Sequence, residues 1–133
     1  MDNIDLMKYW VKSSDGDYIT MKILFENHQN TWCLFIGHLV IEKLLKGLYA
    51  KNNLENPYAL KTHNLLTLAE KCNLELTDAQ LEKLQVITQF NISTRYDDYK
   101  ESFNQKCTDE YTAKQLESIE EVRIWLKEIL IEK

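Results

Sequence analysis

The sequence has few of the residues that break or staple a chain. Its 133 residues include one proline, three glycines and three cysteines. Such a scarcity of chain breakers favours long helices over a sheet with many tight turns. The cysteines are widely spaced and form no CxxC pair, so we expect Cys33, Cys72 and Cys107 to be free thiols in a reducing compartment.

Positive charge and long apolar runs are also scarce. With 16 Lys and Arg against 21 Asp and Glu, the net charge is −5. An acidic surface repels phosphate, which counts against avid nonspecific binding of DNA or RNA but leaves room for a local basic pocket. The most apolar stretch, residues 32–48, is too short and too charged to span a bilayer. The first ten residues lack the apolar segment of a signal peptide. We therefore expect a cytoplasmic protein with no membrane segment.

Hydrophobic periodicity predicts five helices in one domain that spans residues 1–133. Apolar residues recur every three or four positions within each segment, and the chain length suits a single domain. The predicted helices cover residues 4–27, 31–52, 63–72, 77–92 and 108–133. Residues 91–106 are polar and aromatic, and we expect an irregular connection there. The short third helix and the short loops predict an all-α, up-down antiparallel bundle of five helices.

Cap and breaker residues indicate where the helices end. Thr77 and Gln80 have the spacing of a capping box at the start of the fourth helix. Asn73 suits a left-handed cap after the third. In the first segment, Ser13–Gly16 is either a break or a weak point, because glycine costs about 1 kcal/mol relative to alanine inside a helix. We favour one continuous helix.

The second helix carries charges on a wide apolar surface. That breadth predicts a central helix with neighbours on several sides. Glu42 and Lys46 are one turn apart and suit a simple ion pair; alternatively, one of them projects into a polar cleft. His38 and Glu42 are also one turn apart. Since a metal site needs three or four convergent ligands and no third is evident, we interpret them as a satisfied core pair and predict no metal.

Three motifs, taken in order, resemble the HEPN family of helical domains. The first is Asp17 in an amphipathic first helix. The second is the Glu42-Lys43 pair, followed three residues later by Lys46. The third is the helix start Thr62–Leu65, with the run Thr94–Asp98 and its Arg-Tyr motif about thirty residues further on. Each motif alone is weak, but their order and spacing cover roughly residues 6–126.

The resemblance implies a homodimeric helical bundle. Many HEPN proteins are metal-independent ribonucleases or toxins paired with a small nucleotidyltransferase, and others are noncatalytic binding modules. In catalytic members a histidine follows the arginine after four to six residues, whereas here the positions hold Lys100, Glu101 and Ser102. We therefore predict a noncatalytic module of a toxin-antitoxin-like system that binds a nucleotide, RNA or a protein partner. The sequence has no Gly-rich phosphate loop, and we expect no cofactor.

Arg95 is the strongest single site candidate. Its guanidinium can bind two phosphate oxygens and keeps its charge. The alternative is a structural salt bridge with Asp97, Asp98 or Glu42. His63 is either a hydrogen-bonded ring at a helix start or a displaced base in the same groove, and the second option supports a ribonuclease toxin as the alternative function. The predicted ligand-binding cleft comprises Arg95, Tyr96, Glu42, Lys46, Asp17 and His63.

Overall fold

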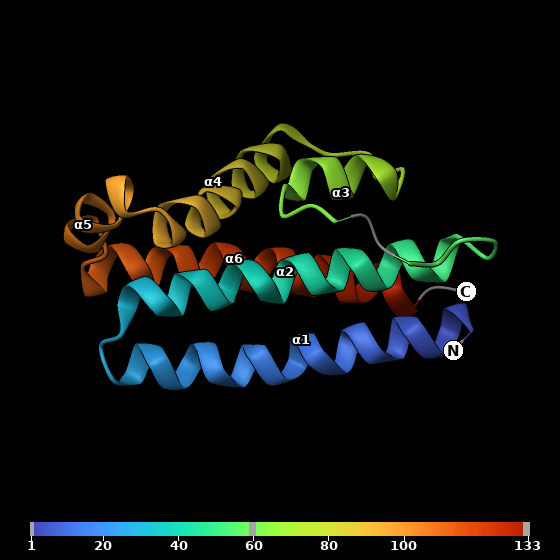
Figure 1. Cartoon of the computed structure of the whole chain (residues 1–133), viewed down its shortest axis with the longest axis horizontal. Helices are drawn as coiled ribbons and strands as arrows, with labels where there is room; N and C mark the ends of the chain where they lie inside the picture. The colour runs from blue at the N-terminus through green and yellow to red at the C-terminus, as the bar shows by residue number, and fades with distance from the viewer. Residues whose placement is uncertain (1, 59–60, 132–133) are drawn as a thin grey trace.

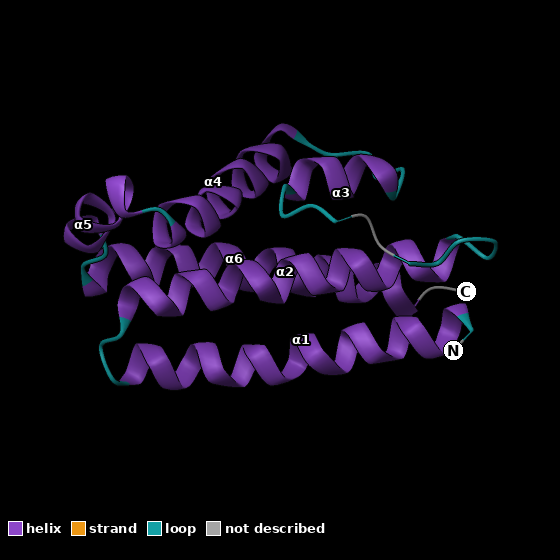
Figure 2. Ribbon diagram, in the orientation of Figure 1, coloured by secondary structure: helices purple, strands orange, loops and turns teal. Residues whose placement is uncertain are grey.

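The chain folds into helices alone wherever its structure is described. A computed structural model describes residues 2–58 and 61–131, without the side chains of Asp97 and Asp98, and this part contains six helices and no strand (Figure 2). The helices are α1 (Asn3–Glu26), α2 (Asn30–Asn52), α3 (Leu65–Lys71), α4 (Asp78–Arg95), α5 (Asp97–Lys106) and α6 (Asp109–Ile131). The all-α prediction is confirmed, but the predicted number of five helices is wrong.

The additional helix lies where the sequence suggested an irregular connection. α4 continues through Arg95, and α5 follows after Tyr96 alone. Phe103 anchors α5, because it is buried and its ring centroid lies 5.8 Å from the ring centroid of Phe90 on α4. One apolar anchor in ten residues produces no repeating apolar stripe, which is why periodicity missed this helix.

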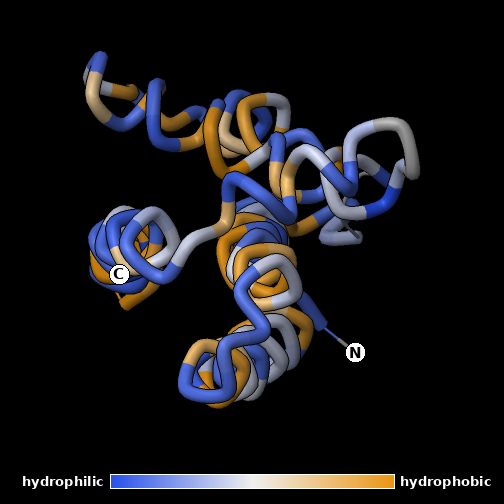
Figure 3. The backbone as a smooth tube through the Cα atoms, turned by 90° about the vertical axis from the view of Figure 1, so that its left-hand side faces the viewer, coloured by the Kyte–Doolittle hydropathy of each residue, from blue (hydrophilic) through white to orange (hydrophobic). Residues whose placement is uncertain are grey.

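α2 is the central helix of the bundle. It packs against each of the other five described helices. Figure 1 shows α1 running antiparallel to α2 on one side, α3 and α4 on the other side, and α6 running beside α2 in the same direction. The end-on view in Figure 3 again places α2 between α1 and α4. The wide apolar surface of this helix therefore has neighbours on several sides, as the sequence predicted.

The core is built mainly on α2. Eight of its residues in the hydrophobic core are at most 1% exposed: Cys33, Leu34, Val40, Ile41, Leu44, Leu45, Leu48 and Ala50. Gly37 allows α1 and α6 to approach closely, since a Cβ atom there would lie 2.5 Å from Ile119 Cδ1 on α6 and 3.2 Å from Met21 Sδ on α1. The structure thus uses this glycine for close packing.

The helix ends follow the cap signals, with one shift. Both hydrogen bonds of the Thr77 capping box form, and Asn73 has a φ of 57° after α3. α1 is continuous through Gly16. The third helix begins two residues later than predicted, because the side chain of Asn64 accepts hydrogen bonds from the amides of Leu66 and Thr67 in the first turn of α3. His63 therefore lies in the segment before α3, not in its first turn.

Two further expectations concern cysteines and membranes. Cys33, Cys72 and Cys107 are buried and free, as predicted. Within the described ranges, every helix is too short or too polar to cross a bilayer.

Candidate functional site

A buried carboxylate on α2 gathers three nitrogen-bearing side chains around it. Glu42 is 4% exposed. Its Oε1 lies 3.1 Å from Nε2 of His38 and 2.7 Å from Nδ1 of His63. Lys46 donates from Nζ to the other carboxylate oxygen, Oε2, at 3.2 Å. We call Glu42, His38, His63 and Lys46 the Glu42 cluster.

The helical repeat explains most of this cluster. His38, Glu42 and Lys46 are spaced four residues apart on α2, so their side chains lie on one face. His63 comes from the chain segment that leads into α3. The helix α3 itself packs against both α2 and α4. Sequence spacing therefore provides three members, and tertiary packing provides the fourth.

The protonation of Glu42 follows from its surroundings. Burial by itself raises the pKa of the carboxyl, because a charged group loses hydration. Hydrogen bonds from His38 and His63, together with the charge of Lys46, outweigh burial and lower the pKa to about 2. Glu42 is thus ionised at neutral pH and acts as a fixed negative charge inside the bundle.

A small pocket opens next to the cluster, between the start of α3 and the end of α4. Its cavity volume is about 170 Å³. The polar side chains that line it are His63, Asn64, Thr88, Asn91, Arg95 and Tyr96. His63 belongs both to this pocket and to the Glu42 cluster. The structure thereby brings together three residues of the predicted cleft: His63, Arg95 and Tyr96.

Arg95 occupies the last turn of α4 and is exposed at the pocket. Its Nη1 lies 3.5 Å from Oδ1 of Asn91, one turn earlier on the same helix. No carboxylate among the described side chains forms an ion pair with it, so the alternative of a salt bridge to Glu42 is not realised. The other two suggested partners, Asp97 and Asp98, lie outside the described side chains.

Two other residues of the predicted cleft lie elsewhere. Asp17 on α1 pairs with Lys43 at 2.6 Å and does not contact the Glu42 cluster. Lys46 belongs to the cluster but not to the pocket, since its ammonium sits 5.3 Å from the ring centroid of Trp10 on α1. The polar residues of α2 therefore face two directions, toward α1 and toward α4.

Sequence reasoning did not select Asn64, Thr88 and Asn91 as pocket residues. Asn91 had one usable signal, because it precedes Arg95 by four residues on the same helix. Thr88 carries a buried hydroxyl that accepts from the amide of Leu65 and donates to the carbonyl of Leu84, so it joins α3 to α4. No sequence pattern marks such a contact between helices.

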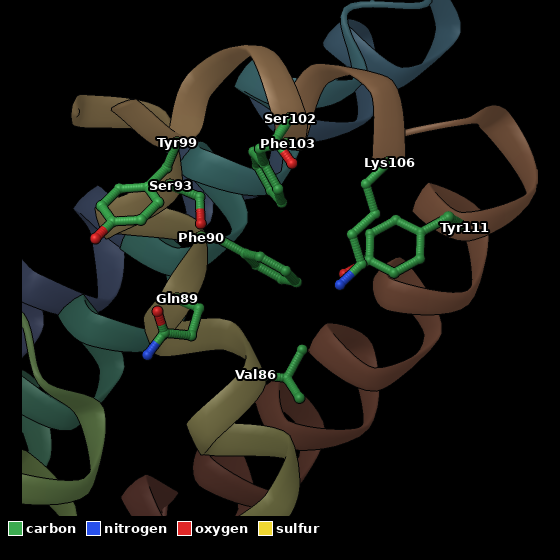
Figure 4. A pocket seen from close by; sticks show the side chains of 9 residues that line it. All are labelled: Val86, Gln89, Phe90, Ser93, Tyr99, Ser102, Phe103, Lys106 and Tyr111. Atoms are coloured by element: carbon green, nitrogen blue, oxygen red, sulfur yellow. The ribbon is translucent and has the colours of Figure 1, made fainter. Parts of the chain in front are cut away.

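A larger pocket lies between α4, α5 and α6 (Figure 4). Its cavity volume is about 330 Å³, and Phe90 and Phe103 form part of its wall. No residue of the predicted cleft lines it. Its one cationic side chain, Lys106, already lies 5.2 Å from the ring centroid of Tyr111. The smaller pocket is therefore the better candidate for binding an anion.

Comparison with known proteins places these features in a family. The model of the HEPN domain matches residues 7–129. The chain belongs to the HEPN family. Neither the curated proteins nor the solved structures contain a match to it. The HEPN match spans both the Glu42 cluster and the pocket at Arg95, so both are features of the HEPN domain of this chain.

Proposed function

We propose that this HEPN domain is a noncatalytic module that binds a nucleotide at the pocket of His63 and Arg95. The observation that carries the proposal is the exposed guanidinium of Arg95, which has no carboxylate partner among the described side chains. A guanidinium held at a pocket without an ion pair is free to bind two oxygens of a phosphate group.

The size of the pocket supports a phosphate rather than an enclosed ligand. Pockets that engulf a small molecule usually measure about 300–1,000 Å³, whereas this one has about 170 Å³. A phosphate and part of a ribose fit such a volume, with the base outside. Tyr96 is 55% exposed at the rim and offers a ring on which a base can stack.

The overall charge favours a short ligand over a long nucleic acid. Avid RNA binding relies on many phosphate contacts from an extended basic surface. The net charge of −5 opposes such binding. A single nucleotide, or one nucleotide at the end of an RNA strand, needs only the local charge of Arg95.

A binding assay with matched charge variants tests this proposal. Calorimetric titration with AMP and with a short single-stranded RNA compares the wild-type protein, Arg95→Ala and Lys114→Ala. Lys114 is an exposed lysine of α6 that does not line the pocket, so its variant loses the same charge without changing the site. We expect Arg95→Ala to weaken binding by about tenfold or more, and Lys114→Ala to change it little. Equal affinities in the two variants would contradict the proposal.

One contact favours a second function, RNA cleavage. Glu42 holds Nδ1 of His63 at 2.7 Å, and a carboxylate-oriented imidazole can act as a general base. Such a ribonuclease would use Arg95 to stabilise the phosphorane. Incubation of RNA with excess protein separates the two functions: cleavage that disappears in both Arg95→Ala and His63→Gln supports the nuclease, and intact RNA supports the binding module.

The partners form a further part of the proposal. Ile19 and Ile23 are 60% and 51% exposed one turn apart on α1, which suits an interface with a second copy. We also propose that the domain works in the cytoplasm beside a minimal nucleotidyltransferase. Sedimentation of the purified protein measures its mass in solution and so distinguishes a dimer from a monomer. A neighbouring reading frame that encodes a small domain with a Gly-Ser motif and paired aspartates would support the second partner.

A further inference from the structure

The Glu42 cluster contains a third potential metal ligand that the sequence did not reveal. His38 and Glu42 supply two such groups from α2, and His63 joins them from the segment before α3. One ligand atom from each of the three residues lies within 4.8 Å of the others. The objection that only two ligands converge at this position therefore no longer applies.

The orientation of His38 is that of a metal-binding histidine. Its ring is fully buried, and Nδ1 lies 3.1 Å from the carbonyl oxygen of Ile87 on α4. A carbonyl oxygen can only accept, so Nδ1 carries the proton and the lone pair of the neutral ring is on Nε2. That lone pair is directed at the Glu42 carboxylate, 3.1 Å away. Metal-ligating histidines almost always have this second hydrogen bond to a carbonyl or carboxylate.

Two acceptors that face each other in a buried site require something positive between them. A proton on Nε2 or a bound cation can meet that requirement, in a ring with no exposed surface. A bound cation can replace that proton and accept the lone pairs of both histidines.

We propose that His38 Nε2, the Glu42 carboxylate and His63 Nδ1 form a binding site for a divalent transition-metal ion of the Zn²⁺ type. Two imidazoles and one carboxylate suit Zn²⁺ or Co²⁺, whereas Mg²⁺ and Ca²⁺ prefer all-oxygen surroundings. Three protein ligands leave a fourth position open. The site would therefore bind its metal together with a water molecule or a small anion.

The geometry requires only a small adjustment. Tetrahedral ligands at about 2.0–2.2 Å from Zn²⁺ lie about 3.4 Å from one another. The nitrogens of His38 and His63 are now 3.1 and 2.7 Å from Glu42 Oε1, so each must move away from that oxygen by a few tenths of an ångström. The side chain of His63 is 52% exposed, whereas that of His38 is fully buried, so His63 can move and the ion enters from its side.

Lys46 works against the metal and gives the proposal a distinctive test. Its ammonium holds Glu42 Oε2 at 3.2 Å, which orients the carboxylate but places a like charge beside the ion. The substitution Lys46→Gln keeps a hydrogen-bond donor and removes that charge. It is expected to tighten metal binding severalfold, which an ordinary surface histidine pair would not show.

The experiment uses tag-free protein that has been treated with a chelator. Co²⁺ titration is followed by visible absorption, and Zn²⁺ is then added to displace Co²⁺. We expect one ion per chain with the absorption of a tetrahedral site. His38→Gln and His63→Gln are each expected to weaken binding by at least tenfold. His28→Gln serves as the control, because His28 is exposed and paired with a single carboxylate, that of Asp109.

The outcomes are decisive in both directions. Absence of saturable one-to-one binding, or equal affinity in wild-type protein and His63→Gln, overturns the metal site. His63→Gln changes a half-exposed side chain, so it remains informative even if His38→Gln fails to fold. The titration contains no nucleotide, and the nucleotide assay contains chelator, so the two proposals fail separately. A metal on Nδ1 of His63 keeps the proton on Nε2, so the loaded form cannot use this histidine as a base.

Discussion

The polar chemistry of this HEPN domain depends on one carboxylate in the middle of an apolar helix. Glu42 replaces its lost hydration with contacts to His38, His63 and Lys46. Burial of such a charge is tolerated only when partners satisfy it. The cluster also fixes the position of His63, and thereby one wall of the pocket that contains Arg95.

Removal of the charge on Glu42 is predicted to destabilise the fold. Glu42→Gln leaves the donors of His38, His63 and Lys46 around a neutral amide, and breaking a buried ionic network costs about 3 kcal/mol. Urea unfolding in the presence of chelator measures the change. The control is Glu117→Gln, an exposed position on α6, which should change stability by less than about 0.5 kcal/mol. Equal stability of the two variants would contradict the role assigned to the cluster.

The buried thiols predict a loss of stability at alkaline pH. Burial raises the pKa of Cys72 from 9.0 to about 12, and its S–H group donates to the carbonyl of Leu45. The unfolded chain therefore releases this proton above pH 9 while the native state keeps it. The contribution is complete below pH 9 and decreases as the pH rises toward 12, by about 1.4 kcal/mol per pH unit.

The variant Cys72→Ala isolates this contribution. It loses packing at neutral pH, but it has no thiol that ionises on unfolding. We expect the stability difference between wild-type protein and Cys72→Ala to be smaller at about pH 10 than at neutral pH. Guanidinium unfolding at both pH values provides the measurement, and a difference that stays constant would show that the thiol is not protected.

Individual site residues were predictable only where a helix or a known motif related them. The resemblance pointed to Arg95 and His63, and the four-residue spacing paired Glu42 with Lys46. The resemblance also assigned Asp17 to the cleft but could not show that its partner is Lys43. Whether His63 reaches Glu42 depends on how the segment before α3 packs, and a single sequence contains no signal for that.

At the scale of helices, two glycines with opposite surroundings provide a matched pair. A Cβ atom at Gly16 on α1 would meet no neighbouring element within 4 Å, whereas a Cβ atom at Gly37 on α2 would lie 2.5 Å from Ile119 Cδ1. Gly16→Ala is expected to raise stability by about 0.5–1 kcal/mol through helix propensity. Gly37→Ala is expected to lower it by about 1–2 kcal/mol, because overpacking outweighs the same gain. Thermal unfolding of both variants measures the two changes.

A second substitution at the same contact checks the cause. Ile119→Val removes the methyl group nearest to Gly37 and costs about 0.5–1.5 kcal/mol by itself. In the Gly37→Ala background we expect this cost to vanish or become a gain, because the new Cβ atom of residue 37 then fills the space that the Ile119 methyl group has left. A double-mutant cycle measures the coupling. Strictly additive effects would mean that α2 and α6 are not in close contact at this point.

The helices themselves were predicted to different degrees. α1, α2 and α6 carry long apolar stripes, and the sequence identified all three. α5 has Phe103 as its buried anchor, so its helix depends on packing against α4 and not on a repeating pattern. α3 begins later than the sequence predicted, because Asn64 is a better N-cap than Thr62.

At the scale of the whole molecule, the bundle surrounds α2 and leaves functional groups on one side of it. α1 and α6 pack against α2, while α3 and α4 meet on the side of α2 that faces away from α1 (Figure 1). The pocket forms where these two helices meet, so its position follows from the topology. The family and the all-α class could be predicted from the sequence, but the side of α2 that carries the site could not.

The central claim is that a nucleotide binds between the segment before α3 and the end of α4. Amide NMR spectra recorded during titration with AMP test it most directly. We predict saturable shifts at residues 62–64 and 91–96, which disappear in Arg95→Ala. Shifts confined to the larger pocket around Phe90 and Tyr111, or no saturable shifts at all, would contradict the account.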